Sequence, residues 1–70
     1  MTTKTIFSVL NRNGTYTTQT VHGHHASRTS SYEDAARTLA RKLHPYQAWE
    51  LKLVDSSEEG TQVFELDLMR

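Results

Sequence analysis

The chain has 70 residues, with eight basic and eight acidic side chains and a formal net charge of zero at pH 7. This length predicts one domain, residues 1–70, with a single small core. The absence of cysteine excludes a disulfide framework and a thiolate zinc site. The neutral balance excludes the global positive field that usually accompanies nucleic-acid binding.

No apolar run approaches membrane-spanning length, and the first residues lack the apolar segment of a signal peptide. We therefore expect a cytoplasmic protein without a membrane partner. The charges are unevenly distributed, because residues 1–32 contain no acidic side chain and all eight carboxylates follow from Glu33 onward. This distribution predicts a molecule with a basic first half and an acidic last part.

The first predicted element is a hairpin. Thr5–Asn11 is rich in residues that favour strands, and Asn13-Gly14 suits a type I′ turn, whose two central residues need positive φ. That turn places Asn11 opposite Tyr16, Val9 opposite Thr18 and Phe7 opposite Thr20. Residues 22–29 show no periodicity and predict a loop.

Only one face of this hairpin can be covered. Ser8 and Gln19 lie on the same face as Ile6, and burying two polar groups without partners costs about 1–3 kcal/mol each. We therefore predict that Phe7 and its face neighbours Val9 and Tyr16 point into the core. The residues Ile6, Leu10 and Val21 are then predicted to be exposed.

A helix follows the loop. Ser30 and Glu33 predict a capping box, Glu33 can pair with Arg37, and Pro45 prevents continuation. One apolar stripe has helical spacing and consists of Tyr32, Ala35, Ala36, Leu39, Ala40 and Leu43. The small alanines predict a helix that lies closely against a sheet.

Two further strands are predicted from alternation, residues 47–55 and 63–68, joined by the acidic loop 55–60. In the first, Trp49, Leu51 and Leu53 share the core side. The predicted fold is α+β, a two-layer sandwich in the order β-β-α-β-β, with a four-stranded, mainly antiparallel sheet and one helix on one face.

One helix covers only one sheet face. The other face is expected to carry the apolar residues Ile6, Leu10, Val21, Val54 and Val63 among the polar and charged residues Ser8, Gln19, Glu50, Lys52, Glu65 and Asp67. Such a mixed patch is typical of contacts with a protein partner or of a homodimer. We predict the partner-binding residues from exposure and charge. They are Ile6, Leu10, Arg12, Val21, Arg28, Arg37, Arg41, Lys42 and Lys52.

Nucleic-acid binding is the second hypothesis. Five basic residues would form its footprint if they lie on one side of the molecule, although a solvated helix face explains them as well. These residues are Arg12, Arg28, Arg37, Arg41 and Lys42.

The segment His22-Gly23-His24-His25 suggests a third hypothesis, since two imidazoles one residue apart on an extended chain can share a metal. A zinc site needs three or four ligands, however, so a polar loop or a pH-sensitive contact explains the segment as well. We therefore predict neither a metal site nor a cofactor. His22 and His24 are the residues that would be the ligands if a metal did bind.

Catalytic signatures are not recognisable in the sequence. There is no nucleophile beside a base, no separated carboxylate pair and no glycine-rich phosphate loop. Ser30 and Ser31 suit helix caps, and Gly14 and Gly60 suit turns. We therefore expect a protein that is not an enzyme.

In its size, its β-β-α-β-β order and the helix opening Ser-Ser-Tyr-Glu-Asp-Ala-Ala-Arg, the chain resembles small phage-encoded inhibitors of host machinery, the anti-CRISPR proteins among them. The resemblance implies a compact inhibitor that blocks a nucleic-acid-processing complex of the host by occupying its nucleic-acid path or partner surface. Many such inhibitors are acidic DNA mimics, and only the acidic last hairpin of this neutral chain matches that pattern. The resemblance assigns no residue.

Overall fold

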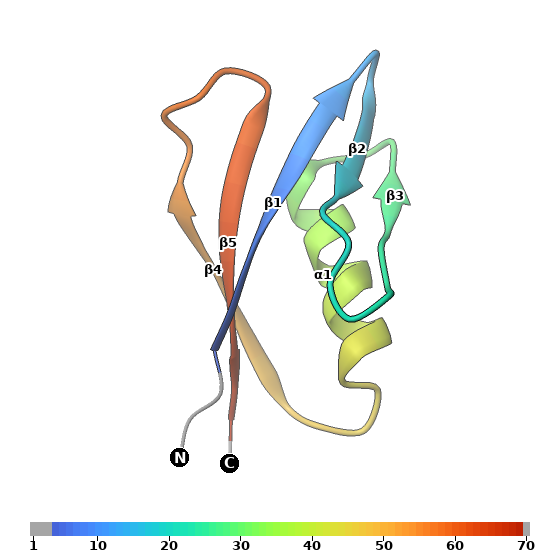
Figure 1. Cartoon of the computed structure of the whole chain (residues 1–70), viewed down its shortest axis with the longest axis vertical. Helices are drawn as coiled ribbons and strands as arrows, with labels where there is room; N and C mark the ends of the chain where they lie inside the picture. The colour runs from blue at the N-terminus through green and yellow to red at the C-terminus, as the bar shows by residue number, and fades with distance from the viewer. Residues whose placement is uncertain (1–3, 70) are drawn as a thin grey trace.

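The structure is a computed structural model that describes residues 4–69. Its elements are β1 (Lys4–Arg12), β2 (Thr15–Thr18), β3 (Ser27–Arg28), α1 (Tyr32–Leu43), β4 (Trp49–Asp55) and β5 (Thr61–Leu68). The strands form one antiparallel sheet in the order β3-β2-β1-β5-β4 (Figure 1). The α+β class is confirmed, but the described sheet has five strands where four were predicted.

The first hairpin forms as predicted. Val9 lies opposite Thr18 and Asn11 opposite Tyr16, while Asn13 and Gly14 have φ values of 52° and 83°. The Asn11 carboxamide oxygen accepts a hydrogen bond from the Gly14 N–H, which fixes the turn from within. The predicted pairing of Phe7 with Thr20 is wrong, because β2 ends at Thr18.

The additional strand comes from the segment predicted to be a loop. Val21 and His24 exchange two backbone hydrogen bonds of 2.8 and 2.9 Å, and the central residues His22 and Gly23 have φ values of 51° and 80°. Positive φ at both central positions makes this a second tight turn. It returns the chain so that β3 pairs with β2 and becomes one edge of the sheet.

The N-cap of helix α1 is Ser31, whose hydroxyl accepts a hydrogen bond from the Asp34 N–H at 3.1 Å. The predicted capping box of Ser30 with Glu33 is therefore wrong, because the cap and the residue that donates to it each lie one position later, at Ser31 and Asp34. The Ser30 hydroxyl instead hydrogen-bonds to the Asp34 carboxylate. The predicted Glu33–Arg37 ion pair is present at 2.9 Å, and the helix ends at Leu43.

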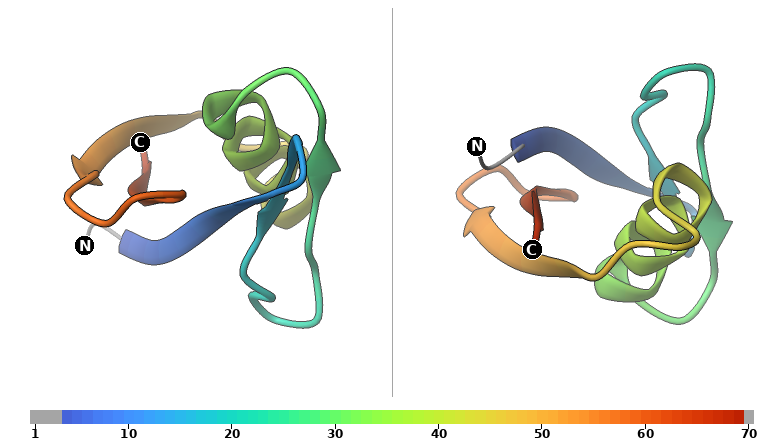
Figure 2. Two further views of the ribbon diagram at one scale, coloured as in Figure 1. Left: turned by 90° about the horizontal axis from the view of Figure 1, so that it is seen from above. Right: turned by 90° about the horizontal axis from the view of Figure 1, so that it is seen from below.

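The core lies between α1 and one face of the sheet. Phe7 and Val9 from β1 are buried, as are Phe64 and Leu66 from β5, whereas Ile6 is 63% exposed. The predicted choice of face is thus confirmed. The helix contributes Ala35, Ala36, Leu39 and Ala40. Seen end-on, the sheet curls and α1 lies inside the curve (Figure 2).

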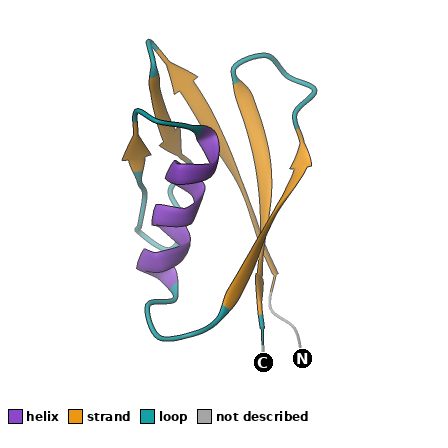
Figure 3. Cartoon of the chain, turned by 180° about the vertical axis from the view of Figure 1, so that it is seen from behind, coloured by secondary structure: helices purple, strands orange, loops and turns teal. Residues whose placement is uncertain are grey.

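The last hairpin departs from its prediction at its outer end. Trp49 and Leu51 are half-buried and pack against the core, but Leu53 is 52% exposed. A β-bulge between Leu53 and Asp55 shifts the register there, and the hairpin diverges from α1 towards its loop (Figure 3). The helix therefore does not cover Leu53. In the loop, the Ser57 N–H donates to Asp55 and lowers the pKa of this carboxyl group.

Candidate functional site

The sheet face turned away from α1 has no second layer of described residues over it. We call this surface the open face. The strand registers place alternate side chains of the three strands β1, β5 and β4 on it. It consists of Lys4, Ile6, Ser8, Leu10, Glu50, Lys52, Thr61, Val63, Glu65 and Asp67.

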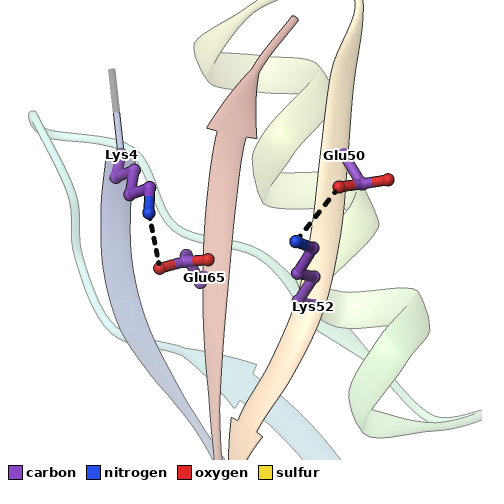
Figure 4. A network of polar contacts seen from close by, with 4 residues as sticks. All are labelled: Lys4, Glu50, Lys52 and Glu65. Atoms are coloured by element: carbon purple, nitrogen blue, oxygen red, sulfur yellow. Dashed lines mark ion pairs between the residues drawn. The ribbon is translucent and has the colours of Figure 1, made fainter. Parts of the chain in front are cut away.

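Ion pairs occupy the half of the open face near the start of β1. Lys4 lies 3.8 Å from Glu65, and Lys52 lies 3.5 Å from Glu50 (Figure 4). Asp67 sits between Lys4 on β1 and Glu50 on β4 in the sheet register. Two lysines and three carboxylates thus share this surface, with both signs interspersed.

This arrangement corrects the predicted separation of charge along the chain. The basic first half and the acidic last part meet because β1 pairs with β5, so Lys4 of the acid-free segment lies directly opposite Asp67. The pairing joins residues more than 60 positions apart in the sequence. The charges of these two strands therefore neutralise each other locally instead of forming two poles.

Apolar and hydroxyl groups occupy the rest of the open face. Ile6 is its most exposed apolar residue, and Leu10 is 38% exposed, as predicted. The Ser8 N–H donates to the Gln19 side-chain oxygen at 3.2 Å, so polar groups beside Ile6 hydrogen-bond to each other. The result is an exposed isoleucine bordered on one side by charged groups and on the other by hydroxyl and amide groups.

The structure does not bring all the predicted partner-binding residues together. Ile6, Leu10 and Lys52 share the open face, and Arg12 ends β1 beside the hairpin turn. The prediction that Val21 is exposed is wrong, because it is half-buried and packs against the core. The turn at His22 and Gly23 folds the chain back and holds Val21 against its own hairpin.

The remaining predicted residues lie in or beside the helix layer. Arg28 Nε donates to the Thr38 hydroxyl at 3.0 Å, Lys42 Nζ donates to the His25 carbonyl oxygen at 2.7 Å, and Arg37 pairs with Glu33. Arg41 is exposed in the last turn of the helix. These four residues are separated from Ile6 and Lys52 by the thickness of the sheet.

The metal hypothesis assumed that His22 and His24 lie on an extended chain, and the structure does not have this geometry. His22 occupies a tight-turn position with positive φ and His24 follows the turn, so the segment is not extended. Within residues 4–69, no three histidine or carboxylate side chains gather in a group able to hold a metal ion. The described helix is too short to cross a membrane.

Comparison with known proteins gave no relative. The scan of protein-family models and the searches of curated proteins and of solved structures found no match to this chain.

A groove lies on the sheet face that α1 covers, opposite the open face, and the sequence did not predict it. It has a volume of about 410 Å³ and lies between α1 and β4. Trp49, Leu51 and Leu53 line it from the strand, the Glu33–Arg37 ion pair lines it from the helix, and Phe64 lies beneath. The exposed fraction of Leu53 follows from this gap, which no sequence signal indicates because it depends on how the hairpin diverges from the helix.

Proposed function

We propose that the protein is a non-enzymatic binding module that recognises a protein partner through its open face. The observation that carries this proposal is the exposure of the Ile6 side chain. Ile6 is 63% exposed on a β1 strand whose next residue, Phe7, is 1% exposed in the core, so its side chain is held outward by the fold. Rigid exposed apolar groups bordered by polar ones are typical of protein interfaces.

The charge of the open face supports a protein rather than a nucleic acid. It carries Glu50, Glu65 and Asp67 against Lys4 and Lys52, and none of its residues is an arginine. Phosphate groups would meet a small excess of negative charge there. A protein surface that has an apolar pocket for Ile6, with positively and negatively charged groups around the pocket, complements the open face better.

The basic residues support nucleic-acid binding less well. Arg28, Arg37 and Lys42 are each engaged with a neighbouring group, and Arg12 lies at a hairpin tip. Arg12 belongs to β1, whereas Arg37, Arg41 and Lys42 belong to α1, so the predicted footprint is divided between different elements. The inhibitor class suggested by the resemblance stays a prediction, and it would make the partner a protein of a host nucleic-acid-processing complex.

Ile6→Lys tests the proposal. Because Ile6 is exposed, the variant should fold with a melting temperature close to the wild type, yet a partner that copurifies with the wild type should be lost from it. Tyr46→Lys is the matched control, since Tyr46 is 98% exposed but lies in the turn after α1, outside the open face.

The comparison is made by pulldown from a lysate of the organism that carries the gene, followed by mass spectrometry. A protein retained by Tyr46→Lys and lost by Ile6→Lys supports the proposal. Retention by both variants, loss by both, or the absence of any retained protein contradicts it.

A further inference from the structure

Strand β4 forms one edge of the described sheet and has a neighbour, β5, on one side only. The Met69 N–H donates to the Ala48 carbonyl oxygen at 3.0 Å, which shows that the Ala48 backbone points towards β5. In an antiparallel ladder this direction alternates along the strand. The backbones of Glu50 and Lys52 therefore also face β5, and those of Trp49, Leu51 and Leu53 face outward.

Six backbone groups of three successive odd-numbered residues are thus presented along this edge. We propose that two copies of the chain pair through β4, antiparallel to each other and centred on Leu51. In this register Leu51 faces Leu51 of the second copy and Trp49 faces Leu53 of the second copy. These are the residues whose N–H and C=O groups face outward, so these groups can form backbone hydrogen bonds between the two copies.

The charges of the edge select the same register. Pairing centred on Leu51 places Glu50 opposite Lys52 of the second copy, and this contact occurs twice by symmetry. Shifting the register either way while keeping the outward residues paired brings Glu50 opposite Glu50, or Lys52 opposite Lys52. Like charges directly opposite each other are unfavourable in a sheet. The strand is therefore self-complementary in one register and self-repelling in those beside it.

The apolar side chains add a reason for pairing. Leu53 is 52% exposed and Trp49 is half-buried, and both line the groove between β4 and α1. In the proposed dimer each Leu53 lies next to Trp49 of the second copy, on the sheet face that bears the groove. The pairing would extend that face and cover apolar surface that one copy leaves exposed. The bulge after Leu53 ends the regular edge, which limits the pairing to this segment.

Charge reversal tests the register. Glu50→Lys gives a strand with two lysines, and Lys52→Glu gives a strand with two glutamates, so each variant alone should dimerise about tenfold or more weakly than the wild type. An equimolar mixture should restore a dimer, because each strand then opposes its complement. Sedimentation over a range of concentrations measures the dissociation constants, and mass spectrometry identifies the heterodimer.

The backbone contact is tested separately. Leu53→Pro removes an outward N–H, which an edge strand tolerates, whereas the control Leu53→Ala shortens the side chain and keeps that N–H. We expect Leu53→Pro to be monomeric and Leu53→Ala to retain more dimer. The charge-reversal mixture gives an independent answer if Leu53→Pro does not fold.

Ile6→Lys, on the open face, should dimerise as the wild type does, so this inference and the proposed function can fail separately. A wild type that is monomeric at millimolar concentration would overturn the inference. So would a dimer that Ile6→Lys abolishes, or one that neither charge reversal weakens.

Discussion

Phe7→Ala should lower the free energy of unfolding by about 3–5 kcal/mol, the range for removing a buried phenylalanine side chain. Phe7 is 1% exposed, and its ring stacks on Phe64 of the neighbouring strand with 6.3 Å between ring centroids. A domain of this size commonly has only about 3–5 kcal/mol of stability. The variant should therefore be largely unfolded at room temperature, as measured by urea unfolding followed by circular dichroism.

Ile6→Ala is the control for Phe7→Ala, because it changes the neighbouring residue of the same strand on the opposite face. It should cost less than about 1 kcal/mol, mainly through the lower strand propensity of alanine. If Ile6→Ala were the more damaging of the two, the face assignment of β1 would be reversed, and the open face described above would be the core.

Ala36→Leu is expected to destabilise the protein by about 1–3 kcal/mol through overpacking. Ala36 is fully buried where α1 meets the sheet, and its neighbours on the stripe include Ala40, also fully buried. Three added carbon atoms would push the helix away from β1 and β2. Arg41→Leu, on the exposed side of the same helix, should change stability by less than about 0.5 kcal/mol.

The two helix variants, Ala36→Leu on the buried face and Arg41→Leu on the exposed face, are compared by thermal unfolding at one protein concentration. Equal melting temperatures for Ala36→Leu and Arg41→Leu would show that the helix does not pack closely against the sheet. A lower melting temperature for Ala36→Leu alone supports the tight helix–sheet contact on which the curled architecture depends.

Local signals were sufficient for the first hairpin and the helix. Asn13-Gly14 sets the register of β1 and β2 because a two-residue turn leaves no freedom in pairing. The alanines and leucines of the helix recur with a period of about 3.6 residues, which is the period of one face of an α-helix, and they therefore identify the buried face. At the N-cap, the capping-box pattern indicated Ser30, whereas the structure has the adjacent Ser31 as the cap.

Features that depend on tertiary contacts could not be predicted. Strand β3 is two exposed polar residues, Ser27 and Arg28, with no periodicity to detect, and it forms because the turn at His22 brings it beside β2. The β1–β5 pairing joins the two ends of the chain, and neither strand specifies its neighbour. Leu53 alternates like a core residue, but the hairpin carries it beyond the reach of the helix.

The open face was predicted in outline, because one helix covers one face and Ser8 and Gln19 mark the uncovered side. The prediction also placed charged groups of both signs on it, namely Glu50, Lys52, Glu65 and Asp67. The Lys4–Glu65 contact was not predicted, since these two residues come together only through the β1–β5 register. Arg37 and Lys42 lie on the helix, whereas Lys52 lies on the open face, so a list of exposed basic residues does not define a surface. Their grouping depends on which layer each belongs to.

The open face as the binding surface is tested most directly by site-specific photocrosslinking in cells. A photoreactive amino acid is placed at position 6 on the open face, or at position 41 on the outer side of α1. We predict a partner crosslinked from position 6 and not from position 41. A partner crosslinked from position 41 alone would contradict the proposal and place the binding surface on the helix layer.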